Sequence, residues 1–213
     1  GAFGSSYNGI TSSITQFLSC IVLLRAGVGS VTRAALYNPL SKKDKSEISG
    51  IVNATAIFMK KVALIYVGAL IVFACVYPFL VRNSFSWIFS ATLVLIIGSS
   101  TFVDNYFGIA YQMLLQADQK NYVNTIPQIV TTILNTIVAA VLIHCGAGIH
   151  LVKLGSAIVY FIRPLFLSYY VKKKYEIDAD IKPNNSAISQ RWDAFAQQAA
   201  AFVNNNTDVI VLT

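Results

Sequence analysis

The sequence predicts an all-α fold, a polytopic bundle of transmembrane helices. Of its 213 residues, 55% are hydrophobic and 12% are charged, which is about half the charged fraction of an ordinary soluble domain. Apolar runs of about twenty residues recur along the chain, and a helix of that length spans the hydrocarbon layer of a bilayer. The runs show no sustained alternation of polar and apolar residues, so transmembrane strands are not expected.

The first two predicted helices are separated by a basic turn. The first covers about residues 8–37 and is expected to end at Asn38-Pro39, because proline disfavours the helical conformation of the residue before it. Ser46 is a candidate N-cap for the second helix, about residues 47–81. The first part of this helix is amphipathic and is expected at the membrane surface, and the second part is an apolar span.

Four more helices are predicted, at about residues 85–117, 122–143, 149–171 and 191–213. The first of these is long for one span, and Gly98-Ser99-Ser100 is the expected bend. A polar cytoplasmic loop, 172–190, separates the bundle of residues 1–171 from the last helix. The chain has no initiator Met and stops inside an apolar run, so we expect a fragment of a longer protein with a truncated last helix.

Basic residues gather in alternate connections. Lysines occupy the turn between the first two helices, the turn at Lys120 and the loop 172–190, whereas the other connections contain Arg82, or His144 and His150. Lys and Arg concentrate in the cytoplasmic loops of membrane proteins, so the basic connections are expected to share the cytoplasmic face. This placement accounts for the net charge of +7 without a nucleic-acid partner, and none is expected.

Ionisable side chains inside the predicted spans are the main functional signal, because each costs roughly 2.5–3.5 kcal/mol on insertion. Arg25 lies well inside the first helix and Arg33 near its cytoplasmic end. Arg163 lies inside the fifth helix beside Pro164, which removes a backbone donor and can kink the helix. Asp104 in the third helix needs a partner, which Arg25 or Arg163 could supply. Both a structural ion pair and a proton- or cation-linked carboxylate fit this position.

Polar side chains, most of them uncharged, form stripes on the last three helices. The stripe on the fourth helix recurs at spacings of three and four residues, at Asn121, Asn124, Gln128, Thr131, Thr132 and Asn135. Two further faces gather polar groups, with Ser156, Tyr160 and Arg163 on the fifth helix and Gln197, Asn205 and Asp208 on the sixth. Interhelical hydrogen bonds and a water-filled cavity both explain such stripes, whereas lipid contact does not. Because guanidinium groups bind phosphate and carboxylate through paired hydrogen bonds, we expect an anionic substrate.

No motif for another chemistry competes with this reading. The sequence contains no Gly-rich phosphate loop, no His/Cys cluster at metal-ligand spacing and no nucleophile elbow, so no metal, other cofactor or enzyme activity is expected. His144 and His150 are interpreted as solvated loop residues. The three cysteines are interpreted as small apolar packing residues, at Cys20, Cys75 and Cys145.

Three stretches of the chain carry a family resemblance. They are Leu23–Arg33 (LLRAGVGSVTR) with the basic turn after it, Gly108–Lys120, and Arg191–Asp208. In that order they resemble the second helix, the fourth helix with its cytoplasmic turn, and the start of the seventh helix of bacterial polysaccharide flippases. These are the O-antigen (Wzx-like) proteins of the multidrug/oligosaccharidyl-lipid/polysaccharide (MOP) exporter superfamily.

The resemblance implies a transporter rather than an enzyme, in which two lobes of helices surround a central cavity. This chain would hold the N-terminal lobe from the second helix to the sixth, and part of the seventh. Such proteins flip undecaprenyl-pyrophosphate-linked oligosaccharides across the bacterial cytoplasmic (inner) membrane by alternating access, with H⁺ or Na⁺ coupling, for lipopolysaccharide O-antigen synthesis. Membrane lipid and polysaccharide polymerase or assembly proteins are the further partners implied. Substrate contacts are then expected at Arg25, Arg33, Gln128, Asn135, Arg163 and Asn205, and ion coupling at Asp104 and Asp208.

Three alternatives remain open. An ion-coupled multidrug antiporter (MATE-like) of the same superfamily would favour acidic and aromatic cavity residues over the arginines seen here. A polytopic membrane enzyme that processes glycans would need a large outer loop or a catalytic acid/base cluster, and the predicted outer loops are short. A structural assembly subunit would not need a polar stripe on the fourth helix.

Overall fold

The computed structural model of the protein describes residues 22–80 and 87–211, with side chains described over 27–76 and 87–201. Within these residues the chain is helical and no strand occurs. Four stretches are long and apolar enough to cross a membrane, at Lys45–Val76, Trp87–Ala117, Tyr122–His144 and Ile149–Tyr175. The predicted class, an all-α bundle of candidate transmembrane helices, is therefore confirmed.

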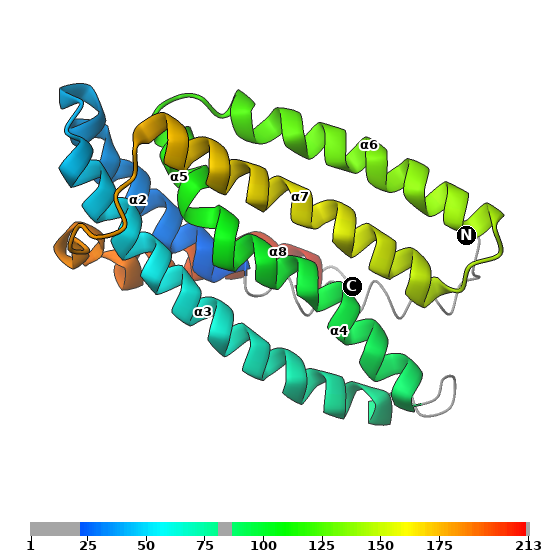
Figure 1. Cartoon of the computed structure of the whole chain (residues 1–213). Helices are drawn as coiled ribbons and strands as arrows, with labels where there is room; N and C mark the ends of the chain where they lie inside the picture. The colour runs from blue at the N-terminus through cyan, green and yellow to red at the C-terminus, as the bar shows by residue number, and fades with distance from the viewer. Residues whose placement is uncertain (1–21, 81–86, 212–213) are drawn as a thin grey trace.

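The helices lie side by side in one bundle (Figure 1). In chain order the elements are α2 (Val22–Lys42), α3 (Lys45–Leu80), α4 (Trp87–Val103), the π-helical turn η1 (Asp104–Gly108), α5 (Ile109–Ala117), α6 (Tyr122–His144), α7 (Ile149–Tyr175), the 3-10 turn η2 (Asn185–Ile188) and α8 (Arg191–Val211). Helix α7 lies between α6 and α4, and α3 packs against α4. Helix α2 packs against α3, α5 and α8.

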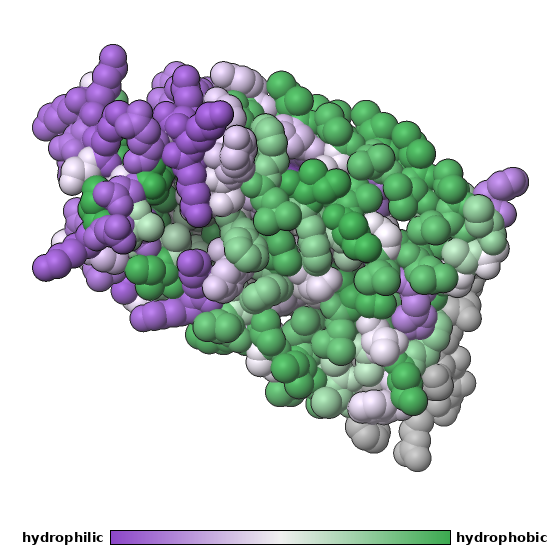
Figure 2. Space-filling model, viewed as in Figure 1, coloured by the Kyte–Doolittle hydropathy of each residue, from purple (hydrophilic) through white to green (hydrophobic). Residues whose placement is uncertain are grey.

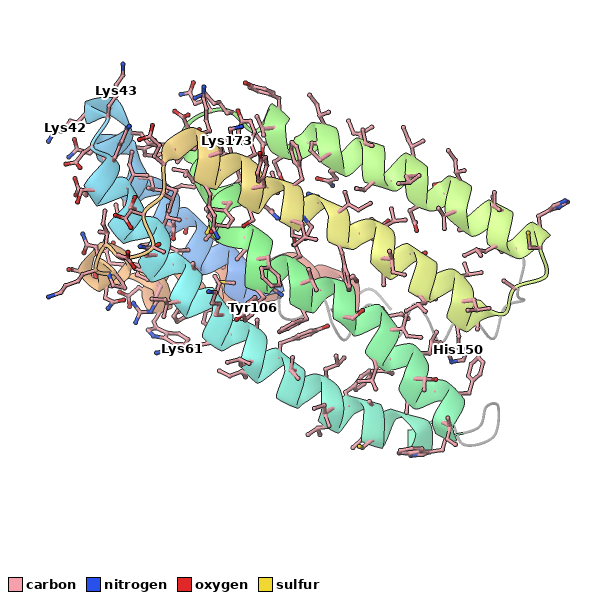
Figure 3. All side chains as sticks on the ribbon, in the orientation of Figure 1. Lys42, Lys43, Lys61, Tyr106, His150 and Lys173 are labelled. Carbon is pink, nitrogen blue, oxygen red and sulfur yellow. The ribbon has the colours of Figure 1, made fainter. Side chains whose placement is uncertain are left out.

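The surface of the bundle divides into a hydrophilic end and an apolar body (Figure 2). Lys42, Lys43 and Lys173 lie at the hydrophilic end, and His150 lies at the opposite end (Figure 3). Apolar side chains cover the body of the bundle, such as Ile65, which is 73% exposed. An apolar body that ends in a cluster of lysines is the surface expected of a helix bundle that crosses a bilayer with its basic end at the cytoplasm.

The prediction that the first helix ends at Asn38-Pro39 is wrong, because α2 continues through Pro39 to Lys42. A proline in the last turn removes only one backbone donor, and the helix ends where Lys43 adopts a positive φ of 56°. The N–H of Asp44 then donates to the carbonyl of Pro39 at 3.0 Å, which is the pattern of a Schellman C-terminus.

The N-cap of α3 is Asp44 rather than Ser46. Helix α3 begins at Lys45, and the Oδ1 atom of Asp44 accepts the backbone N–H of Glu47 at 3.0 Å. An Asp side chain satisfies a free N–H group at a helix N-terminus and also matches the helix dipole. The turn therefore ends one helix and begins the next within two residues, which holds α2 and α3 in an antiparallel pair.

The third predicted span is irregular at η1 and not at Gly98-Ser99-Ser100. A Cβ atom on Gly98 would lie 2.4 Å from Leu70 Cδ1, and the Gly98 carbonyl accepts the Tyr66 hydroxyl at 3.0 Å. Gly98 therefore provides room for α3 to approach, and the helix continues through it. The chain widens into a π-turn six residues later, at Asp104, where an extra residue enters the helical ladder.

The segment predicted as a free loop, 172–190, is partly helical and packs across the basic end. Helix α7 extends to Tyr175, and η2 forms a further turn. The Nδ2 group of Asn53 on α3 donates to the carbonyls of Asp178 and Ile181, at 2.8 and 3.0 Å. Ile188 is 1% exposed and joins the bundle as an apolar anchor.

Candidate functional site

Polar side chains of α6 and α7, some buried and some only half-buried, face one another along a shared interface. The Nη2 group of Arg163 on α7 donates to Asn124 Oδ1 on α6 at 2.8 Å. Further along the pair, Asn135 Nδ2 donates to the hydroxyl of Tyr160 at 3.3 Å. Thr131 lies between these two contacts in the sequence of α6 and is 3% exposed. Predicted site residues Asn135 and Arg163 are therefore placed on one face, which we call the α6–α7 polar face.

Gln128 is not part of the α6–α7 polar face, although it belongs to the same sequence stripe. Positions 124, 131 and 135 fall within about 40° around the helix axis, at about 100° per residue. Thr132 lies about 60° beyond Asn135, whereas Gln128 lies only about 20° beyond it. Both side chains are exposed, and this exposure separates Gln128 from the face. The Thr132 hydroxyl donates to the backbone carbonyl of Gln128 at 2.8 Å, so the Thr132 side chain finds its hydrogen-bond partner within α6.

A polar cavity of about 190 Å³ continues this face toward the end of the bundle opposite the lysines. Asn135, Ser156 and Tyr160 line it together with Lys153 and Ser100. Among the described residues, the Oδ1 atom of Asn135 is buried without a hydrogen-bond partner. The cavity thus presents an unused acceptor, two hydroxyl groups of α7 and a cation, which suits a ligand that carries both hydroxyl groups and negative charge.

Lys153 is a candidate site residue that the sequence reading missed. It precedes Ser156, Tyr160 and Arg163 at spacings of three, four and three residues, so the four share a face of α7. It lies near the start of α7, in the second turn of the helix. The same spacing argument that joined the other three residues would have found it.

The η1 turn brings Asp104 next to the proline of α7. Asp104 Oδ1 accepts Gln112 Nε2 at 2.8 Å. A Cβ atom on Gly108 would lie 3.0 Å from Pro164 Cβ and 3.1 Å from Asp104 Oδ1, so the missing side chain lets α7 approach the turn. Two irregular helix segments, a π-turn and a proline, therefore meet at a carboxylate. The hydrogen bond described for Asp104 comes from Gln112, and the side chain of Arg25 lies outside the described residues. The pairing of Asp104 with Arg163 or Arg25 therefore stays a prediction.

The other predicted substrate and ion residues lie apart from this face or outside the described side chains. Arg33 Nη1 donates to Gln116 Oε1 at 2.9 Å, which links α2 to α5. Asn205 and Asp208 lie in α8, but their side chains, like that of Arg25, are outside the described residues. Their roles stay predictions.

The basic end carries a second polar cluster that the sequence reading missed. Asp118 accepts hydrogen bonds from the ammonium of Lys120 and from the hydroxyl of Tyr175. The hydrogen bond to the Asp118 carboxylate raises the pKa of Lys120 above its usual value. The cluster ties the turn between α5 and α6 to the last turn of α7, so it fixes these three helices to one another at the basic end of the bundle.

His150 is not the solvated loop residue that the sequence suggested. It lies in the first turn of α7, with Nε2 at 2.8 Å from Thr92 Oγ1 and 3.1 Å from the Phe89 carbonyl. Its ring also meets the Phe89 ring edge-on, with centroids 4.4 Å apart. His150 therefore joins α7 to α4 at the end of the bundle opposite the lysines, whereas His144 is exposed.

Fold and site together define a polytopic α-helical membrane protein with buried polar groups between its helices. Across the described residues no group of three His, Cys, Asp or Glu side chains is placed to hold a metal ion. No protein-family model matches the chain, and no curated protein or solved structure matches it either. The function must therefore be argued from the α6–α7 polar face and its surroundings.

Proposed function

We propose that the chain is part of a transporter that moves a lipid-linked oligosaccharide across the bacterial cytoplasmic membrane. The observation that carries the proposal is the α6–α7 polar face, where Arg163 and Asn135 are held between two helices of spanning length. Burying a guanidinium in such a place is costly, and such residues in spanning helices mark substrate or ion pathways by default.

The chemistry of the face suits a glycan joined to a phosphate group. The fork of Arg163 can bind two phosphate oxygens, and Lys153 adds a second positive charge about ten residues, or roughly 15 Å, along the same helix. Ser156 and Tyr160 lie between the two cations along α7, and Asn135 of α6 is hydrogen-bonded to Tyr160. All three can exchange hydrogen bonds with sugar hydroxyls. An anion of pyrophosphate size at one cation and sugars at the amide and hydroxyl groups would fill the face.

The neighbouring irregular helices supply a means of movement. A π-turn and a proline each weaken the backbone ladder of their helix, and here Gly108 and Pro164 touch. Asp104 belongs to the same turn, so a change in its proton or cation occupancy would act where the helices can bend. This supports alternating access with ion coupling at Asp104.

An ion-coupled antiporter of the same superfamily is the second candidate, favoured by the carboxylate of Asp104 in the η1 turn. The two transporters differ in their need for Arg163, because a cationic drug gains nothing from a guanidinium. A glycan-processing enzyme is supported less, since the connection between α6 and α7 consists of residues 145–148 alone.

The test is complementation by the full-length protein in a host that lacks its own flippase. Arg163→Ala should abolish surface polysaccharide while the protein still inserts at its normal level, and Arg163→Lys should restore part of it. Ile162→Ala is the matched control, since Ile162 is exposed on the same turn of α7, and it should leave polysaccharide unchanged. Normal polysaccharide with Arg163→Ala would exclude this role for Arg163.

A further inference from the structure

A second, smaller cavity lies on another side of α7. It measures about 120 Å³ and opens between α3, the η1–α5 segment and α7. Its polar lining consists of Lys60, Asn105, Tyr106, Tyr111, Ser168 and Lys172. Ser168 and Lys172 lie about 80° and 120° round α7 from Tyr160, so this cavity is separate from the α6–α7 polar face. The structure assigns this cavity to the phosphate of an anionic phospholipid with a hydroxylated headgroup, such as phosphatidylglycerol.

The depth of the cavity matches the level of lipid phosphates. At about 1.5 Å per residue, Lys60 lies about 30 Å from Leu80 along α3, and Lys172 lies about 35 Å from Ile149 along α7. The hydrocarbon layer is about 30 Å thick, so both lysines lie one layer away from the opposite ends of their helices. Lys61 and Tyr106 lie toward the basic end of the bundle, on the side of α3 and η1 (Figure 3).

The charges of the cavity suit a phosphodiester. Lys60 and Lys172 are both exposed, and over the described parts of the chain no carboxylate lies within salt-bridge distance of either ammonium. The ammonium of Lys60 lies 5.3 Å from the centroid of the Tyr106 ring, which holds its charge at the mouth of the cavity. Basic pockets between helices on the cytoplasmic side are established binding places for lipid headgroups.

Asn105 gives independent support for a ligand. It is 0% exposed and lines the cavity, and its Oδ1 has no hydrogen-bond partner among the described residues. A buried acceptor without a donor costs about 1–3 kcal/mol. A headgroup hydroxyl can supply that donor, which is why a glycerol headgroup fits better than a choline headgroup.

The surface beside the cavity suits the acyl chains. Phe107 lines the cavity and is 41% exposed, and Leu64, one turn beyond Lys60 on α3, is 62% exposed. A lipid with its phosphate at the two lysines would therefore lay its chains over apolar side chains. This inference does not depend on the proposed transport function.

Native mass spectrometry of the purified full-length protein tests the assignment, with phosphatidylglycerol titrated into detergent micelles. The Lys60→Gln/Lys172→Gln double variant should bind phosphatidylglycerol at least about tenfold more weakly, because each substitution removes the attraction of one lysine for the negative lipid headgroup. Lys43→Gln/Lys174→Gln is the matched control, because both lysines are exposed at the basic end but do not line the cavity, and it should bind as the unmodified protein does.

Three further ligands, phosphatidylmethanol, inorganic phosphate and phosphatidylcholine, identify what is recognised. Phosphatidylmethanol carries the same charge without headgroup hydroxyls and should bind more weakly than phosphatidylglycerol, by a margin that Asn105→Leu removes. Inorganic phosphate should not displace the lipid. Equal binding by the double variant and the control would overturn the assignment, and so would displacement by inorganic phosphate or equal affinity for phosphatidylcholine.

Discussion

Replacing Gly27 by alanine should lower the free energy of unfolding by about 2 kcal/mol. The new Cβ atom would lie 2.6 Å from the backbone N and Cα atoms of Phe195 on α8. Carbon atoms pack best about 3.5–4.0 Å apart, so α2 and α8 would have to separate by about 1 Å. Overpacking of this kind costs about 1–3 kcal/mol, and a rigid backbone neighbour favours the upper end of that range. The better helix propensity of alanine offsets about 1 kcal/mol of this cost.

Gly68→Ala is the matched control, because Gly68 also lies inside a helix but a Cβ atom there would meet nothing within 4 Å. This variant should be neutral or stabilised by up to about 1 kcal/mol. The assay is reversible unfolding of the full-length protein in mixed micelles, followed by circular dichroism. If the two variants unfold alike, the close approach of α2 and α8 at Gly27 is wrong.

Two other predictions concern contacts within the bundle. Asp118→Asn should cost about 1–2 kcal/mol, because the carboxylate accepts from both Lys120 and Tyr175. Because the pKa of Lys120 is raised in the folded protein, its contribution to the free energy of unfolding is complete below its usual pKa of 10.5 and is lost as the pH rises through the higher folded value. The free energy of unfolding should therefore fall when the pH is raised above 10.5, and Asp118→Asn should reduce this fall. Tyr66→Phe should cost about 1 kcal/mol by removing the donor to the Gly98 carbonyl, and an unchanged unfolding midpoint would remove that hydrogen bond from the account.

Hydropathy and spacing predicted the helices that have sharp ends. Helices α6 and α7 both begin at the predicted residues. A short turn with Gly146 in a positive-φ conformation separates their two apolar runs, which makes the end of α6 and the start of α7 sharp. The end of α2 could not be predicted from Pro39 alone, since a proline in the last turn is tolerated and the backbone at Lys43 decides the end. Gly98 looked like a bend because the sequence does not reveal that a leucine from α3 occupies its free side.

The sequence also predicted only part of the candidate site. Spacing placed Asn135 and Arg163 on inward faces, since buried polar groups in spanning helices need partners. Spacing also included Gln128, because a stripe read at three and four residues drifts around the helix and only contacts show where it stops. The π-turn at Asp104 could not be predicted, since it depends on how closely Pro164 approaches Gly108.

The proposed transport route requires the α6–α7 polar face to be open to water within the membrane. Its most direct test is thiol labelling of the full-length protein in proteoliposomes, after the native cysteines are replaced by alanine. Ser156→Cys lines the polar cavity, whereas Ile158→Cys lies about 160° round α7 from Tyr160 and is 58% exposed on the apolar surface. Only a thiol in contact with water forms the reactive thiolate. A membrane-impermeant maleimide should therefore label Ser156→Cys and leave Ile158→Cys unlabelled. An unreactive Ser156→Cys, or equal labelling of both, would show that the face is closed to water.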